Sequence, residues 1–167
     1  ALVRQLNDDL EKARIAAGLI PLRGTGVVFQ LQDSLQPTAP GRNEDDYRVS
    51  ARDIRTVIEE LWLAGADAIS VNGERMTTST AILDIGASIL VNSAFLAQPY
   101  QISAIGPKDL YDRVSASQGF ADFLRARSET YGIQVSFFQP DAVDVPAFAG
   151  TVSLRFAHPA ATPGPGS

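Results

Sequence analysis

The period of the apolar residues changes several times between residues 24 and 138, and this feature most constrains the fold. Val27, Phe29 and Leu31 occupy alternate positions, which is typical of a β-strand with one buried face. After residue 50 the spacing becomes that of a helix. The apolar positions of this predicted helix are Ile54, Val57, Ile58 and Leu61. A chain that switches between these two periods is expected to pack helices against a sheet.

Two local signals delimit the predicted helix. Ser50 precedes it and can cap its first turn, and Asp53 follows as the acidic partner of a capping box. Gly65 lies near its end, at a position where helices commonly stop. These signals predict a well-defined helix between Ser50 and Gly65.

The rest of the chain continues the alternation of strands and helices. The segments with a strand pattern are residues 68–71, 88–96, 99–106 and 133–138. A helical pattern covers residues 106–132. After Pro140 the strand signals are less regular, and Pro146 limits that segment to an edge strand or a bulge.

Turn-forming residues separate these segments. The Gln98-Pro99 pair interrupts two predicted strands, and we expect a hairpin there. Gly119 is expected to divide the long helical region into two short helices or to bend it, and Gly132 suits its C-terminal end. Residues 33–49 contain prolines and an acidic cluster, and they are predicted to form a solvated loop.

The resulting order is strand, helix, strand, two strands, helix and strand. This order is close to βαββαβ, the α+β ferredoxin-like arrangement in which helices cover one face of an antiparallel sheet. We assign this domain to residues 24–157 and expect embellishment in the hairpin region. Residues 158–167 are rich in proline and glycine and are predicted to form a flexible tail.

Residues 1–20 precede the domain and are predicted to form an N-terminal helix. Its narrow apolar stripe consists of Leu2, Leu6, Leu10, Ala13 and Ala17. A stripe of this width is typical of a coiled-coil seam or of a docked helix. Two interpretations therefore stay open: the helix packs on its own domain, or it is the end of a longer coiled coil.

The stretch from residue 68 to residue 82 is unusually rich in polar groups that could bind a ligand. Asn72-Gly73 is a strong signal for a two-residue turn. The hydroxyl residues 77–80 can cap a short helix that begins near Ala81. A structural role therefore accounts for the stretch.

The alternative interpretation of the same stretch is a binding site. Asn72, Arg75 and Asn92 would form a polar recess, and the guanidinium group would bind a carboxylate or a phosphate. These three residues are the only ligand-binding candidates that we derive from the sequence.

Composition disfavours several other functions. The chain has no Cys, which removes disulfides, thiolate nucleophiles and Cys-based metal sites. Its formal charge of -5 disfavours a nucleic-acid surface. His158 is the only His, so neither a metal site nor a catalytic triad can be placed around it. We therefore expect no catalytic residues, no metal and no cofactor.

Three blocks of sequence resemble a known family. The blocks are "ELWLAGADAISVNGERM", "ILVN" and "PYQISAIG", in this order. They are similar to domain-of-unknown-function family 881, a group of bacterial envelope-associated proteins found in Gram-positive and actinobacterial lineages. The resemblance implies a membrane anchor, a coiled coil and then this domain outside the cytoplasm. It implies no reaction and no catalytic residues.

Two functions are consistent with these observations. The first is a non-catalytic interaction domain of a membrane-anchored envelope protein, possessing cell-envelope or cell-division partners and associating with itself as a dimer. The second is a sensory module that binds a small anion. The first has the wider support, because the resemblance and the N-terminal stripe both favour it. Nucleic acid is not an expected partner.

Overall fold

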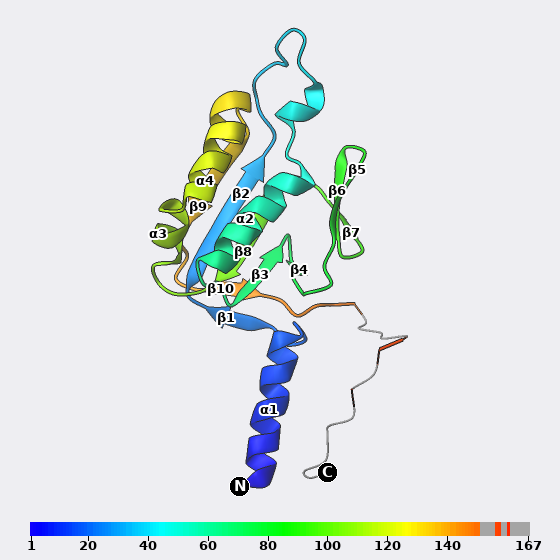
Figure 1. The fold of residues 1–167 in the computed structure, drawn as a ribbon, viewed down its shortest axis with the longest axis vertical. Coiled ribbons are helices and arrows are strands. Elements are labelled where there is room, and N and C mark those ends of the chain that lie inside the picture. The colour runs from blue at the N-terminus through cyan, green and yellow to red at the C-terminus, as the bar shows by residue number, and fades with distance from the viewer. Residues whose placement is uncertain (151–155, 158–159, 161–167) are drawn as a thin grey trace.

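A computed structural model describes residues 1–150, 156–157 and 160 of the chain, and Figure 1 shows its arrangement. Helices cover one face of a central sheet, and one further helix projects from an end of the domain. The predicted α+β class, with antiparallel sheets and an N-terminal helix, is confirmed. Most of the predicted tail, including His158, lies outside the described residues.

The central sheet has five strands in the order β4-β3-β8-β2-β9, and all neighbouring strands are antiparallel. Val27, Phe29 and Leu31 of β2 are fully or almost fully buried, as their alternation predicts. The strands are β2 (Gly26–Gln32), β3 (Ala68–Val71), β4 (Glu74–Arg75), β8 (Tyr100–Ile105) and β9 (Gln134–Phe138).

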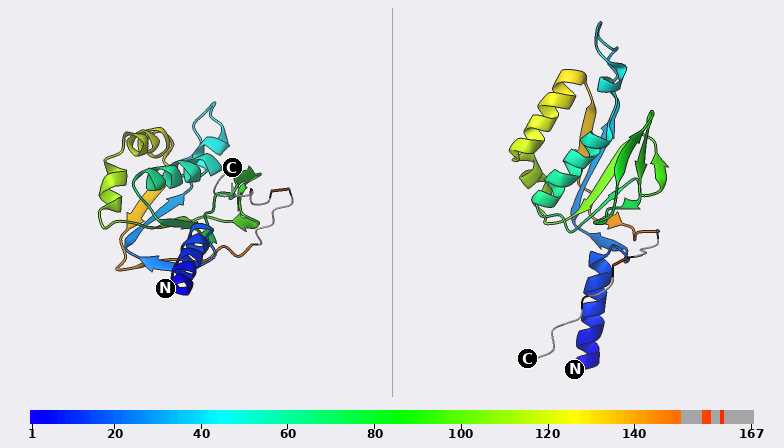
Figure 2. Two further views of the ribbon diagram at one scale, coloured as in Figure 1. Left: turned by 60° about the horizontal axis from the view of Figure 1, so that its bottom comes forward. Right: turned by 45° about the vertical axis from the view of Figure 1, so that its right-hand side comes forward.

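The helices lie together on one face of this sheet (Figure 2). The predicted capping box is present at the start of α2, where Ser50 accepts from the Asp53 amide and Asp53 accepts from the Ser50 amide. The predicted apolar stripe of α2 is buried against the sheet. The helices are α2 (Ala51–Leu63), α3 (Leu110–Ser115), α4 (Gln118–Phe123) and the π-helical η2 (Leu124–Glu129).

The predicted helical region 106–132 is divided, but not at Gly119. The break comes at Ala116 and Ser117. The Ser117 hydroxyl accepts a hydrogen bond from the Phe120 amide at 3.2 Å and caps α4. A serine N-cap therefore determines where the second helix begins, and the glycine lies in its first turn.

A smaller apolar cluster lies behind the central sheet. It joins Val28 of β2 to Val143 and Val145. The last two residues belong to β10 (Val143–Val145), which pairs with β1 (Leu22–Gly24) in a two-stranded sheet. Among the described residues β10 has no second partner strand and ends directly before Pro146, as expected for a proline-limited edge.

The predicted hairpin at Gln98-Pro99 is wrong. A separate three-stranded antiparallel sheet has the order β5-β6-β7, and β8 belongs to the central sheet. The turn between β6 and β7 lies at Asn92, which has a φ of 56°. Gln98-Pro99 instead connects the two sheets. The three strands are β5 (Ile82–Ile85), β6 (Ser88–Val91) and β7 (Ala94–Leu96).

The predicted short helix near Ala81 is also wrong, because β5 begins there. The hydroxyl residues form a turn of their own: the Thr77 amide donates to Thr80 Oγ1 at 2.9 Å, and the Thr80 amide donates to the Thr77 carbonyl at 3.2 Å. Ile82 is buried while Ile85 is 46% exposed. The hydroxyl groups are thus used inside the turn and do not cap a helix.

The N-terminal helix α1 (Leu2–Ala16) extends away from the domain (Figure 1). None of its residues is buried. Leu2, Leu6 and Leu10 are 69%, 57% and 58% exposed. The structure therefore does not place the apolar stripe on the described part of the domain.

Candidate functional site

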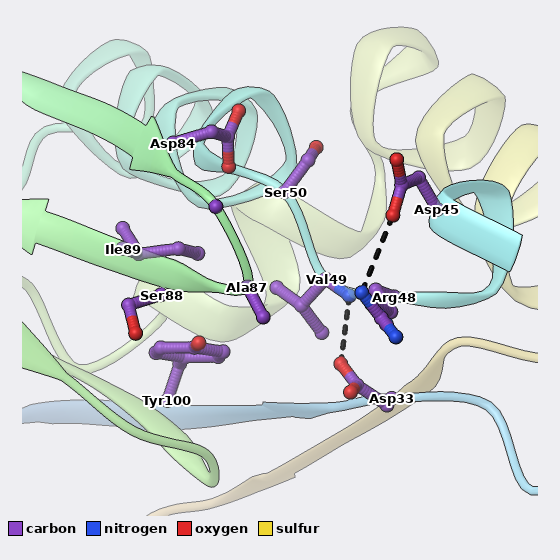
Figure 3. A pocket seen from close by; sticks show the side chains of 11 residues that line it. Asp33, Asp45, Arg48, Val49, Ser50, Asp84, Ala87, Ser88, Ile89 and Tyr100 are labelled. Atoms are coloured by element: carbon purple, nitrogen blue, oxygen red, sulfur yellow. Dashed lines mark hydrogen bonds and ion pairs between the residues drawn. The ribbon is translucent and has the colours of Figure 1, made fainter.

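A cavity of about 200 Å³ lies between the N-terminal end of α2, the β5–β6 turn and the start of β8. Figure 3 shows the side chains that surround it. Four separate segments of the chain contribute to its walls, and each contributes at least one polar side chain. The polar residues that matter most for its chemistry are Asp33, Arg48, Ser50, Asp84, Ser88 and Tyr100.

Two carboxylates hold the main chain where it enters α2. Asp33 Oδ1 accepts from the Val49 amide at 2.8 Å, and Asp84 Oδ1 accepts from the Ala51 amide at 2.8 Å. Gln98 Nε2 donates to the second oxygen of Asp33 at 3.2 Å. The N-terminal end of a helix favours negative charge, so the two carboxylates interact favourably with the main chain there.

Tyr100 forms the opposite wall of the cavity (Figure 3) and is only 4% exposed. Its hydroxyl makes no hydrogen bond to any residue of the described chain. Within the same residues every fully shielded side-chain nitrogen or oxygen has a partner, so the hydroxyl opens into the cavity. Burial raises the pKa of Tyr100, and the charges of Asp33 and Asp84 raise it further. The phenol therefore stays protonated at neutral pH.

The charge balance of the cavity is negative. Arg48 is paired with Asp45, with 3.3 Å between Nη1 and Oδ1. The side chains of Arg48 and Asp45 are 46% and 76% exposed. Asp33 and Asp84 have no cationic partner among the described residues, so two negative charges border the cavity without compensation.

Arg75, the central residue of the predicted anion site, is buried and only 3% exposed. Its Nη1 donates to the carbonyls of Ile20 at 2.9 Å and Pro146 at 3.1 Å, and its Nη2 donates to the carbonyl of Ile15 at 3.4 Å. Burial lowers the pKa of Arg75. The guanidinium group thus joins the end of α1 and the segment after β10 to the central sheet.

Asn92 lies close to Arg75, whereas the Asn72 side chain bonds elsewhere. Asn92 Nδ2 donates to the Arg75 carbonyl at 3.2 Å and to Glu74 Oε2 at 3.1 Å. The Asn72 side chain donates to the Ala97 carbonyl and accepts from the Gln101 amide. Both asparagines have positive φ, which is the turn conformation that favours this residue type. Anion binding by the three residues stays a prediction.

Sequence reasoning did not identify the Tyr100 cavity. Asp33, Asp84 and Tyr100 lie in three different segments, and no spacing along the chain links them. The capping signal at Ser50 points to one side of this region. Among the described residues, no group of three or more His, Asp or Glu side chains is arranged to hold a metal ion. In the same residues, no helix combines the length and the apolar character that a membrane span requires.

These features together define the class of protein: an α+β domain with a projecting N-terminal helix and a small acidic cavity. The family model described as "Bacterial protein of unknown function (DUF881)" matches residues 9–158. The chain belongs to this family, and the resemblance found in the three sequence blocks is confirmed.

The chain is similar to curated proteins from two bacterial genera. UPF0749 protein Rv1823 of Mycobacterium tuberculosis is 32% identical over 158 residues, which cover 89% of this chain and 50% of that protein. UPF0749 protein YlxW of Bacillus subtilis is 34% identical over 118 residues, which cover 70% of this chain and 51% of that protein. The chain thus spans about half the length of these relatives.

One solved structure is also similar. The crystal structure of an uncharacterized conserved protein from Mycobacterium tuberculosis has a TM-score of 0.68 and 27% sequence identity. The match covers 91% of this chain and 99% of that chain. The family is described as one of unknown function, and the solved structure as that of an uncharacterized conserved protein.

Proposed function

We propose that the chain is a non-catalytic interaction domain of a membrane-anchored envelope protein, and that it lies on the extracytoplasmic side of the cell membrane. The observation that carries the proposal is the exposed apolar stripe of α1. A helix that leaves its leucines more than half exposed is expected to bury them against another chain. The second support is the family resemblance, which implies an anchor and a coiled coil before the domain.

The spacing of the exposed residues favours a coiled coil. With Val3, which is 71% exposed, in place of Leu2, the positions of the stripe follow the alternating three- and four-residue spacing of a heptad repeat. These positions are Val3, Leu6, Leu10, Ala13 and Ala17. We infer a parallel dimer, because parallel helices place both domains at the same end of a stalk and a two-fold dimer is the commonest closed assembly.

Sedimentation equilibrium tests this proposal. Helix α1 has 15 residues, which is about two heptads, so the dimer of this chain should be weak and depend on protein concentration. A natural chain with more of the upstream sequence should associate more tightly. A longer chain that stays monomeric at high concentration would exclude the coiled coil.

Localisation needs its own experiment. Fusion of the full-length protein to a phosphatase reporter that is active only outside the cytoplasm should give an active reporter at the C-terminus. An inactive fusion of normal abundance would overturn the extracytoplasmic assignment. A pull-down with the full-length protein would then identify its envelope or cell-division partners.

We also infer that the central domain has the ferredoxin-like arrangement. The four longer strands lie in the order β3-β8-β2-β9 and are antiparallel. The helix α2 connects β2 to β3, and the α3–η2 region connects β8 to β9. This is the strand order and crossover pattern of the βαββαβ motif. The β5-β6-β7 sheet is an insertion between β3 and β8.

The anion-binding alternative has weaker support. All hydrogen bonds of the Arg75 guanidinium in the described chain are to backbone carbonyls, and Glu74 adds a negative charge beside Asn92. A titration with inorganic phosphate distinguishes the two functions. Saturable binding that is lost in Asn92→Ala would favour the anion site.

A further inference from the structure

We propose that the cavity beside Tyr100 binds a primary ammonium group at the end of an aliphatic chain. The hydroxyl of the buried residue Tyr100 opens into the cavity and has no partner among the described residues, and two carboxylates without a cationic partner border the cavity. The proposal does not depend on the coiled coil, because α1 lies at the other end of the molecule (Figure 1).

The sign of the charge selects a cation. Asp33 and Asp84 already accept hydrogen bonds from the backbone, and their charges remain uncompensated. An anion placed here would be repelled by both carboxylates, whereas a cation would be attracted. Tyr100 adds a lone pair and an aromatic ring, and both attract an ammonium group.

The volume of the cavity fits the end of a ligand, and not a whole drug-sized molecule. Its volume of about 200 Å³ is smaller than the roughly 300 Å³ at which pockets for drug-sized ligands begin. Val49, Ala87 and Ile89 provide apolar wall surface. An alkylammonium chain fits this combination, since its methylene groups contact the apolar wall while its charged end meets the oxygens.

The hydrogen-bonding pattern selects a primary amine. An ammonium group has three N–H donors, and Tyr100, Asp33 and Asp84 present acceptor oxygens from three sides of a cavity that the Ser50 and Ser88 hydroxyls also line. Calcium requires six to eight oxygen ligands, and no group of three or more acidic or His side chains in the described residues is arranged to hold a metal ion. The raised pKa of Tyr100 keeps the phenol neutral and avoids a third negative charge.

The ligand can come from two sources that share this chemistry: a free small amine or a lysine side chain of a partner protein. Two probes distinguish them. The first is cadaverine, and the second is an N-acetylated, C-amidated Gly-Lys-Gly peptide. Each is titrated into the ¹⁵N-labelled protein at neutral pH and low salt, and amide resonances are followed by NMR. The better-bound probe indicates the source.

The expected result is a saturable shift of the Val49 and Ala51 amide resonances. These two amides donate to Asp33 and Asp84, so they report directly on the carboxylates. The peptide with an acetylated lysine side chain keeps the length and loses the charge, and it should cause no shift. High salt should weaken binding of the charged probes.

Two variants test the assigned groups. Tyr100→Phe keeps the ring in the core and removes the hydroxyl, and it should weaken binding about tenfold. Asp84→Asn keeps an oxygen for the Ala51 amide and removes the charge, and it should also weaken binding. Asp144→Asn is the matched control: it removes an exposed carboxylate on β10, and binding should be unchanged.

Measurements on the wild-type protein alone can overturn the proposal. They do so if neither probe gives a saturable shift of the Val49 and Ala51 amide resonances. The proposal also fails if Tyr100→Phe or Asp84→Asn binds as tightly as the wild type. Equal binding of the acetylated peptide would show that charge plays no part, and that result would overturn the assignment as well.

Discussion

At the scale of single residues, Arg127 has the most connected side chain in the described part of the protein. Its Nε and Nη2 donate to the two oxygens of Asp53 at 2.8 and 3.0 Å. Its Nη1 and Nη2 also donate to the carbonyls of Asp46 and Arg48, and its guanidinium lies 5.3 Å from the centre of the Tyr131 ring. The Arg127 side chain, which belongs to η2, thus joins the loop before α2 to both α2 and η2.

Arg127→Met should therefore reduce the free energy of unfolding by about 3–5 kcal/mol, because it leaves the buried Asp53 carboxylate without its partner. Arg125→Met is the matched control. Arg125 also forms an ion pair, with Asp122 at 3.1 Å, but both partners are more than half exposed. Its loss should cost less than about 1 kcal/mol. Urea unfolding of both variants checks the prediction, and equal losses would contradict it.

Tyr100 makes stability depend on pH. Its pKa is raised above the ordinary value of 10.0, because burial and two carboxylates disfavour the phenolate. The folded state therefore favours the neutral phenol, and this contribution is complete below about pH 10 and is lost as pH rises further. Tyr100→Phe should lose less stability than the wild type between about pH 9 and pH 11. Urea unfolding at both pH values measures the difference, and parallel losses would show that Tyr100 titrates normally.

At the scale of elements, the predictable parts of the fold are those with a local cause. The α2 stripe and its capping box are local patterns, and both are confirmed. The failures arise where the cause is tertiary. Gln98-Pro99 looks like a hairpin turn, but whether β7 pairs with β8 depends on the surfaces that each strand covers. Residues 77–80 look like a helix cap, but their hydroxyls bond to one another and to Asn92.

The same limit applies to the candidate site. Its lining residues Asp33, Asp84 and Tyr100 come from different segments, so only the folded chain brings them together. The prediction groups Asn72, Arg75 and Asn92 by the chemistry of their side chains, two amides and a guanidinium group that could bind an anion. The structure brings only Arg75 and Asn92 into direct contact.

Burial of the apolar stripe of α2 should make a measurable contribution to the free energy of unfolding. Leu61 is fully buried, so Leu61→Ala should reduce the free energy of unfolding by about 2–5 kcal/mol through lost burial and a residual cavity. Leu63→Ala is the matched control, because Leu63 is on the same helix but 82% exposed, and its change should stay within about 0.5 kcal/mol. Thermal unfolding compares the two variants. An unchanged midpoint for Leu61→Ala would contradict the packing of α2 on the sheet.

At the scale of the whole molecule, α1 and the domain are separate in packing but joined by hydrogen bonds. No residue of α1 is buried, so its side chains contribute little to the domain core. Self-association and domain stability should therefore respond to different substitutions.

Leu6→Glu should weaken self-association of the longer chain and leave the thermal midpoint of the domain unchanged. The reason is that a charge at a seam position repels its symmetry mate, while Leu6 is 57% exposed and contributes nothing to the core. Leu35→Glu, at an 86% exposed loop position, is the control and should alter neither property. Sedimentation equilibrium and calorimetry measure the two effects. A lowered midpoint for Leu6→Glu would show that the stripe packs on its own domain.

The hydrogen bonds from Arg75 to three carbonyls affect how the domain is oriented relative to α1. They belong to Ile15 near the end of α1, to Ile20 two residues before β1 and to Pro146 directly after β10, so the helix is held at a set angle to the central sheet. The Tyr100 cavity lies at the opposite end of the domain from that junction. In an anchored protein the length of the helix would then set the distance between the membrane and the cavity. Each helical residue added between the anchor and the junction would lift the cavity about 1.5 Å farther from the membrane.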